Sequence, residues 1–332
     1  MPTSVSQRKR RSERLGKGDS GLGTDTTIRP MHAEDADAVR ALDVQAFGPY
    51  YRRFAGGRAV PCRTRENVLA CLALNPAGCF VAGAGEELVG FIFSRRWGAV
   101  GWAGVFGVHP EKQGQGIGRQ LLHRAVAQLE AAGCRVIGLE TMPDSTYNVG
   151  LYARAGFHPA HPTVVLTKEI EAPVQQPSFA LLSRLPTQAG LAIVTEISES
   201  AQPGLDCAVE AWNALEHGWG ETLLIGQPEP WGAAIVRTRP KREGDVKAVA
   251  EVAALVIRAG ARERLAEALQ AVGSYARQWD LATLRLPVYS ADWATLEALL
   301  ALGFRVWHLG LRLLVRGEYG CPAGVDLSRW AM

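Results

Sequence analysis

The chain alternates between short apolar runs and stretches in which apolar residues recur at helical spacing. The run 99–108 is almost wholly apolar and predicts a buried strand, whereas the apolar side chains of 119–132 repeat at the interval of a helix. By the same criteria, we expect strands at 26–30, 79–84, 88–97, 135–140 and 163–168, and helices at 33–47, 66–74 and 146–155. Strands alternating with helices predict the α/β class, with a mixed sheet flanked by helices.

A glycine-rich turn at 113–118 (QGQGIG) joins that strand to that helix. The first N–H groups of a helix lack internal partners, the helix dipole adds positive charge there, and glycine lets an anion approach the backbone. The turn fits Q/R-x-x-G-x-G/A at Gln113, Gly116 and Gly118, and departs from both the dinucleotide fingerprint and the P-loop. It therefore indicates a phosphate-binding turn, the alternative being an ordinary connection with flexible glycines.

A second block, 147–157 (YNVGLYARAGF), follows the turn after one helix and one expected strand. Together the two blocks resemble the GNAT superfamily of N-acetyltransferases, in which the first binds the pyrophosphate of coenzyme A and the second is often written N-V-x-L-Y-x-x-x-G-F. The resemblance implies the family's fold, acetyl-CoA as acyl donor, and transfer of an acetyl group to a primary amine. The residues it implies in binding acetyl-CoA are Phe106, Gly107, Val108, Gln113, Gly114, Gln115, Gly116, Ile117, Gly118, Arg119, Asn148 and Tyr152.

Acetyl transfer to an amine also needs a proton for the departing thiolate. Tyr152 has the position at which the family often uses a tyrosine as general acid, and a phenol with a pKa near ~10 is protonated at neutral pH. The alternative is that Tyr152 only packs against the sulfur end of the cofactor. Asn148, one helical turn earlier, either hydrogen-bonds the pantetheine arm or caps its own helix.

The base that accepts the proton of the amine is less clearly marked. Many family members carry an acidic residue on the strand before the turn, but 99–107 contains no carboxylate. Glu140, at the end of the next expected strand, is the best substitute, with Asp144 behind it. Either carboxylate is alternatively a solvated charge at a strand end, and the amine is alternatively deprotonated by water.

An aromatic and basic segment, 47–54 (FGPYYRRF), is expected to form a loop after the first helix. The resemblance places such a loop beside the acceptor, which makes Tyr50, Tyr51, Arg52 and Arg53 the candidate substrate-binding residues. Aromatic walls and positive charge suit an amine that carries a carboxylate or phosphate, although the charges are alternatively a solvated surface. The six cysteines are scattered without metal-ligand spacing, so no metal is expected.

The second half of the chain repeats the first. A motif at 299–304 (LLALGF) echoes the end of the second block, and superposing Gly303 on Gly156 brings a strand at 282–287 and a helix at 266–279 into register with those of the first half. We therefore expect a tandem GNAT-like protein. Its expected divisions are a disordered basic tail (1–25), a catalytic domain (26–172), a linker (173–187) and a degenerate second domain (188–332).

The repeat has lost the chemical groups of the first copy. The same alignment puts Gly260, Glu263, Leu265 and Leu299 where the first half has Gln113, Gly116, Gly118 and Tyr152. A carboxylate and a branched side chain would repel and block a phosphate. We therefore expect one working site, in the first half.

Composition bears on the number of domains, the kind of partner and the cellular compartment. A chain of 332 residues with 47% hydrophobic and 21% charged residues suits two globular domains. The net charge of +3, much of it in the tail, is too small to favour nucleic acid, although a basic binding arm is an alternative interpretation of the tail. No run suits a membrane span or a signal peptide, and scattered cysteines suit a reducing compartment.

We therefore expect a cytoplasmic N-acetyltransferase acting on a small-molecule or protein amine, either monomeric or as a homodimer. Two alternatives belong to other classes of protein. One is a coenzyme A-binding regulator that has lost turnover, which the missing strand carboxylate favours. The other is an interaction protein whose tail and second domain recruit a partner.

Overall fold

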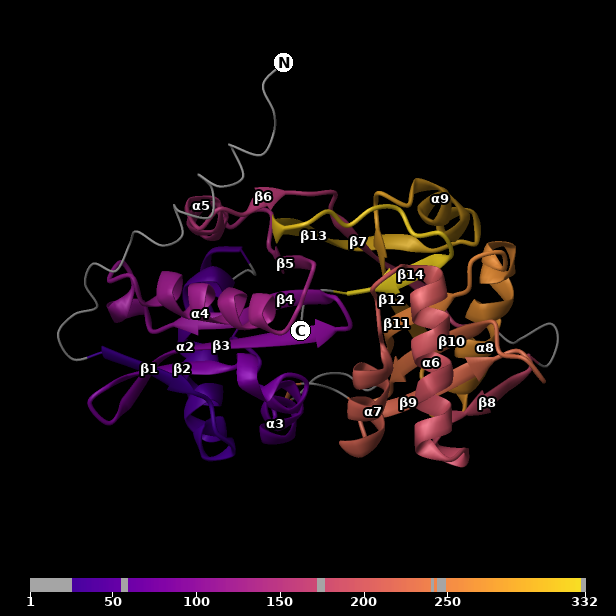
Figure 1. Ribbon diagram of the computed structural model, residues 1–332, viewed down its shortest axis with the longest axis horizontal. Helices are drawn as coiled ribbons and strands as arrows, with labels where there is room; N and C mark the ends of the chain where they lie inside the picture. The colour runs from indigo at the N-terminus through magenta and orange to yellow at the C-terminus, as the bar shows by residue number, and fades with distance from the viewer. Residues whose placement is uncertain (1–25, 55–58, 172–176, 240–241, 244–248, 330–332) are drawn as a thin grey trace, which may run out of the picture.

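The structure, a computed structural model, describes residues 26–54, 59–171, 177–239, 242–243 and 249–329 (Figure 1). The expected disordered tail lies outside these residues. In the first half, the strands are β1 (Thr26–Pro30), β2 (Phe80–Ala84), β3 (Glu87–Trp97), β4 (Val100–Val108), β5 (Val136–Thr141), β6 (His158–Pro159) and β7 (Thr163–Glu169). The helices of this half are α2 (Ala36–Phe54), α3 (Arg65–Ala73), α4 (Ile117–Ala131) and α5 (Thr146–Arg154).

The second half has the same order of elements. Its strands are β8 (Phe179–Leu181), β9 (Gly220–Ile225), β10 (Gly232–Arg237), β11 (Val249–Ile257), β12 (Thr283–Tyr289), β13 (Arg305–Arg316) and β14 (Val325–Ser328). Its helices are α6 (Thr187–Ala201), α7 (Ala208–Glu216), α8 (Leu265–Arg277) and α9 (Trp293–Ala301). Because β8 and a short turn at Leu182–Arg184 fall inside the segment expected as a linker, the second repeat begins earlier than the sequence indicated.

Helices cover both faces of the sheet in the first half. Successive residues of a strand point to opposite faces, and on β3 this sends Phe91 and Phe93 to one side and Ile92 to the other. The two phenylalanines lie in a core cluster with side chains of α2 and α3, while Ile92 packs with Leu121 and Leu122 of α4. The strand is therefore apolar on both faces, which suits its nearly continuous hydrophobic sequence.

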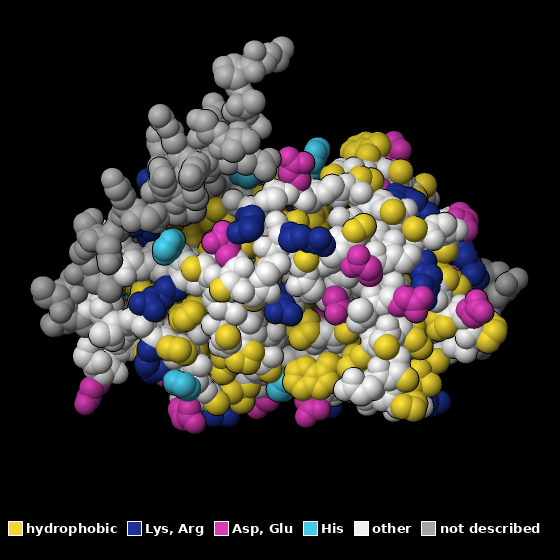
Figure 2. Space-filling view, viewed as in Figure 1, with side chains coloured by type: hydrophobic (Ala, Val, Ile, Leu, Met, Phe, Trp, Pro, Cys, Tyr) yellow, Lys and Arg dark blue, Asp and Glu magenta, His cyan; other side chains and the backbone are white. Residues whose placement is uncertain are grey.

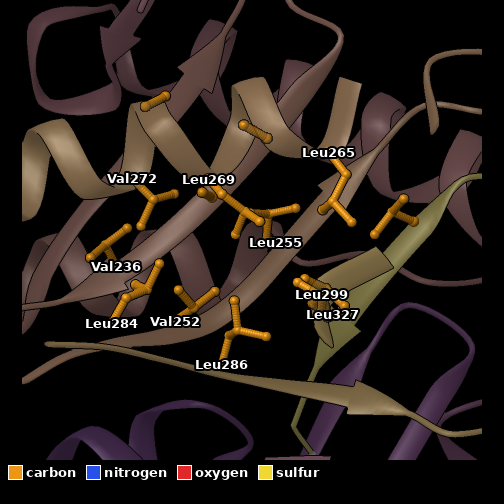
Figure 3. Packing of buried hydrophobic residues seen from close by; sticks show 14 of the residues in the cluster. Val236, Val252, Leu255, Leu265, Leu269, Val272, Leu284, Leu286, Leu299 and Leu327 are labelled. Atoms are coloured by element: carbon orange, nitrogen blue, oxygen red, sulfur yellow. The ribbon is translucent and has the colours of Figure 1, made fainter. Parts of the chain in front are cut away.

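The second half buries its own core between α8 and the sheet (Figure 3). Leu265, Leu269 and Val272 lie at helical spacing on one face of α8 and pack with Leu255 of β11 and Leu286 of β12. Each fully buried leucine or valine of this kind contributes about 1.5–3 kcal/mol of hydrophobic free energy. This core lets the second repeat keep its fold although its phosphate turn has changed.

The two halves exchange their last long strands. The sheet runs β1-β2-β3-β4-β5-β13-β7-β12-β11-β10-β9-β8, so β13 of the second half pairs with β5, and β7 of the first half pairs with β12. β7 and β13 also pair with each other, antiparallel, with Thr163 opposite Gly310. In Figure 1 the yellow strand β13 accordingly lies among the magenta strands of the first half. Each half thus completes the sheet of the other.

The segment 47–54, expected as a loop, is instead the end of α2. α2 contains Pro49, whose backbone φ is close to that of a helix and whose cost comes from a lost hydrogen bond and local crowding. The last turn is held from outside, because the Tyr50 hydroxyl donates to Asp144 Oδ1 at 3.2 Å. Tertiary contact therefore outweighs the local helix-breaking signal.

Buried ion pairs also join the halves. Arg95 of β3 lies 3.4 Å from the Glu210 carboxylate on α7, and Arg237 of β10 pairs with the same carboxylate. Asn213 of α7 donates a hydrogen bond of 2.9 Å to the carbonyl of Ala70 on α3. Because these groups are buried away from water, each depends on its partner across the junction.

Candidate active site

One edge of β4 is open where the strand leaves its parallel neighbour. β4 pairs with β5 only from Val100 to Trp102. Beyond this point, the register against β3 slips between Ile92 and Ser94, which leaves an extra residue on β4. Such a bulge bends a strand. From Ala103 onward, β4 has no partner on its β5 side among the described residues, and we call this stretch the open edge of β4.

Backbone polar groups face the open edge. The N–H of His109 donates to the Val89 carbonyl of β3 at 2.9 Å. Because backbone groups alternate sides along a strand, the N–H and C=O groups of Phe106 and Val108 point the other way, toward the open edge. Gln113 Nε2 donates to the Val108 carbonyl at 3.2 Å. A chain with its own amide groups, such as pantetheine, therefore finds donors and acceptors here.

The glycine turn lies at the end of this edge. Gly114 and Gly116 have φ values of +80° and +83°, which glycine tolerates best, and a Cβ at either would meet no atom within 4 Å. Gly116 is the N-cap of α4, so the first N–H groups of the helix open onto this space. A Cβ at Gly118 would instead meet Phe106 and Val108 at 3.4 and 3.5 Å. These are ordinary van der Waals distances, so position 118 faces β4, whereas the open space at the turn lies at Gly114 and Gly116.

The other residues expected at the cofactor lie around the same turn. Gln113, Gln115 and Arg119 are exposed, so Arg119 can add positive charge at the rim of the cradle. Ile117 is buried in the core under α4. Asn148 is half-buried on α5, and the N-cap of that helix is Ser145.

The phenol of Tyr152 is buried beside the open edge. Its ring is 6% exposed and lies 5.9 Å from the ring of Phe106 on β4 and 6.0 Å from that of Phe157, measured between centroids. The hydroxyl hydrogen-bonds with Thr141 at the end of β5. Burial raises the pKa of the Tyr152 phenol well above its usual range, and Thr141 partly opposes this. The group therefore holds its proton throughout the neutral range.

Glu140 is a buried carboxylate, not a solvated charge at a strand end. Its side chain is 2% exposed, and Oε1 lies 3.7 Å from Arg329 Nε. Oε2 is buried and accepts no hydrogen bond from any described residue. A Cβ at Gly310 of β13 would lie 2.3 Å from Oε1, so the Glu140 carboxylate lies directly against the backbone at position 310 and would have to move if that residue had a side chain.

Three residues of the second half, His308, Gly310 and Arg329, lie around this carboxylate. The sequence patterns did not indicate them. Burial lowers the pKa of His308 on β13, and the nearby Arg329 adds to the effect while Glu140 and Asp144 oppose it. His308 is therefore a neutral imidazole at neutral pH. No local signal marks these residues, because strand exchange brings His308 and Gly310 of β13 to the first half, and Arg329 follows β14, which pairs with β11.

The four residues expected to bind the substrate lie on the last turns of α2, where their surroundings differ. Tyr50 is half-buried and bonded to Asp144, and this contact raises its pKa to about 12 together with burial, the larger cause. Tyr51 touches the Tyr50 ring at 6.1 Å between centroids. Arg52 and Arg53 are exposed in the last turn of the helix. Of these residues, Tyr50 is bonded to Asp144, the carboxylate that follows Glu140 in the sequence prediction of the base.

In the described residues of the second half, the edge that corresponds to the open edge of β4 is occupied by another strand. β11 and β12 pair from Val249 to Glu251 and then separate, but β14 pairs antiparallel with β11 from Ala254 to Ile257. The helix starts also differ by one position from the alignment expected, because the N-cap of α8 is Arg264. The Arg264 guanidinium lies 4.1 Å from the centroid of the Trp231 ring. The chain itself therefore fills the place that is open in the first half.

Fold and site define the class of this protein as a tandem acyl-CoA N-acyltransferase fold with one open strand edge. Residues 45–157 match the model described as "Acetyltransferase (GNAT) family". The Mycothiol acetyltransferase of Pseudarthrobacter chlorophenolicus is 32% identical over 148 residues, which cover 42% of this chain and 44% of that protein. The match therefore spans less than half of the length of this curated relative.

Solved structures match nearly the whole chain. A protein of Pyrococcus horikoshii superposes with a TM-score of 0.66 at 18% identity, covering 95% of this chain and 98% of that one. A tandem GNAT protein from the clavulanic acid biosynthesis pathway gives a TM-score of 0.54 at 15% identity, covering 90% and 99%. These matches confirm the tandem fold expected from the sequence.

Two further observations concern the described residues alone. They contain no group of three or more His, Cys, Asp or Glu side chains placed to hold a metal ion. Within the same residues, none of the helices has both the length and the apolar character needed to cross a membrane.

Proposed function

We propose that the protein is an acetyl-CoA-dependent N-acetyltransferase with a single working site, in the first half. The observation that carries this proposal is the open edge of β4, which ends at the glycine turn and has the buried phenol of Tyr152 beside it. When bound, acetyl-CoA supplies an activated thioester. The N–H groups at the start of α4 and the backbone of Phe106 and Val108 would hold it.

Two side chains move the protons. Glu140 accepts the proton that the attacking amine loses, directly or through one water, while the new carbon–nitrogen bond forms and the carbon–sulfur bond breaks. Tyr152 Oη gives its proton to the departing sulfur. Burial of Glu140 beside Arg329 keeps the carboxylate close to one cation and away from bulk water. The proposal thus needs no carboxylate on β4.

The test is acetyl-CoA-dependent release of free thiol over a broad panel of amines, together with calorimetric binding of acetyl-CoA. We expect turnover of at least one amine and one coenzyme site per chain. The name of the relatives makes mycothiol-related amines part of the panel. Tight binding without turnover of any small or protein amine would instead support the second candidate, a coenzyme A-binding regulator, which the missing carboxylate on β4 favours.

The proposal extends to partners and location. We propose an amine acceptor, small-molecule or protein, and a cytoplasmic location, in keeping with six unpaired cysteines. On the face shown in Figure 2, Lys and Arg side chains are interspersed with Asp and Glu, which gives little support for a nucleic-acid partner. A homodimer is tested by sedimentation of the full chain.

A further inference from the structure

The second half of the chain supplies one wall around the candidate base. Arg329 directly follows β14, the strand that fills the second half's own place for a cofactor. Gly310 of β13 lies against the Glu140 side chain. Since β13 and β14 come from the second half and Glu140 from the first, the acceptor side of the site is composite.

Two buried polar atoms at this point lack partners. Glu140 Oε2 accepts no hydrogen bond, and Arg329 Nε donates none, within the part of the chain that the structure describes. Leaving a buried charged group without its hydrogen bonds is costly, so such atoms call for a ligand or an ordered water. A carboxylate oxygen needs a donor such as an ammonium group, and a guanidinium needs an acceptor such as a carboxylate or phosphate.

Arg329 is also accessible to a ligand. Its side chain is 24% exposed, and it lines a pocket at the junction with Val165 of β7 and Pro287 of β12. Arg52 and Arg53, the cations that the sequence suggested for an anionic acceptor, are exposed at the end of α2 instead. Arg329 forms an ion pair with the candidate base.

We infer that the acceptor is a small zwitterion, whose amine binds at Glu140 and whose carboxylate or phosphate binds the guanidinium of Arg329. The inference rests on the proposed acetyltransferase function and specifies its acceptor class. An amine and an anionic group a few bonds apart match a carboxylate and a guanidinium that are 3.7 Å apart. Specificity for this class therefore depends on a residue of the repeat that has lost its own phosphate turn.

Matched amine pairs test the inference. Amino acids are compared with their amides, which tests for recognition of a carboxylate. Phosphoethanolamine is compared with ethanolamine, which tests for recognition of a phosphate. In the wild type, kcat/KM for the anionic member of one pair should exceed that for its neutral partner by about 10- to 100-fold, the range expected for a hydrogen-bonded charge. Arg329→Gln should remove that preference through KM, so that kcat/KM falls by about 10- to 100-fold more for the anionic amine than for its neutral partner, and it should leave the affinity for acetyl-CoA unchanged.

A binding measurement keeps this test separate from turnover. The preferred zwitterions are titrated calorimetrically into the full-length protein without acetyl-CoA, and we expect binding that Arg329→Gln weakens by a similar factor. Arg316→Gln is the matched control, because Arg316 lies on β13, is half exposed and pairs with Glu130 of α4, remote from Glu140. It should leave both measurements unchanged.

The outcomes distinguish the inference from the proposed function. Turnover of amines without preference for the anionic member, or an equal loss for both members in Arg329→Gln, would overturn the inference and leave the acetyltransferase standing. Absence of acetyl-CoA binding would overturn the function, while zwitterion binding that depends on Arg329 would still support the site. Zwitterions that bind wild type and Arg329→Gln equally, or bind neither, would overturn the site itself.

Discussion

The phenol of Tyr152 is the residue on which the proposed chemistry depends most. Tyr152→Phe removes one oxygen and leaves the ring against Phe106 and Phe157. Because a positioned general acid contributes about 10²–10⁴-fold, we expect kcat to fall by that order while the calorimetric affinity for acetyl-CoA is kept. Tyr147→Phe on the same helix, at a side chain that is 56% exposed, is the control and should change neither. Equal kcat in wild type and Tyr152→Phe would contradict the assignment.

The burial of the Tyr152 phenol also determines how kcat should depend on pH. Burial disfavours the phenolate and so raises the pKa of Tyr152, which means that the acid form persists to higher pH than in an exposed tyrosine. We expect no loss of kcat around pH ~10, where an ordinary phenol titrates. An alkaline decline centred there in wild type but absent from Tyr152→Phe would show that the phenol is less protected than the structure indicates.

At the scale of elements, the strand–turn–helix unit from β4 to α4 forms the cradle. Gly116→Glu places a carboxylate in open space at the N-terminus of α4, where it repels a diphosphate, and strains a φ of +83°. We expect calorimetric binding of acetyl-CoA to be lost. Gly133→Glu is the matched control, because Gly133 has a φ of +85° and equally open surroundings at the other end of α4. Both variants should lose similar thermal stability, and only Gly116→Glu should lose binding.

Elements were predicted from sequence where their signals are local. Hydrophobic spacing and glycine chemistry indicated the strand, turn and helix around Gly116, because those signals lie within a few residues. The loop expected at 47–54 was wrong, since α2 continues to Phe54 and a hydrogen bond from Tyr50 to Asp144 holds its end.

At the scale of the whole molecule, the halves are joined by exchanged strands and by buried ion pairs. Glu210→Ala would leave Arg95, 4% exposed, without its carboxylate. Breaking a buried pair from one side costs about 3–5 kcal/mol, so we expect a large loss of unfolding free energy by denaturant titration. Glu196→Ala removes a surface partner of Arg258 and should change stability little. Equal losses of unfolding free energy in the two variants would mean that the buried ion pair between the halves stabilises the protein no more than a surface ion pair.

The same junction explains what sequence patterns do not reveal. The repeat around Gly303 indicated a tandem chain, and the two halves do share their order of elements. It did not indicate that β13 pairs with β5, or that Arg329 reaches Glu140, because both contacts join residues remote in sequence. A hydrophobic pattern specifies which face of a strand is buried, and it leaves open which strand lies beside it.

The most direct test of the account is amine-dependent release of free thiol from acetyl-CoA, measured side by side for the wild type, Gly116→Glu and Gly133→Glu. We predict release with at least one zwitterionic amine for the wild type and Gly133→Glu, and none for Gly116→Glu. Undiminished release by Gly116→Glu would contradict the central claim, because the working site would then lie away from the glycine turn of the first half.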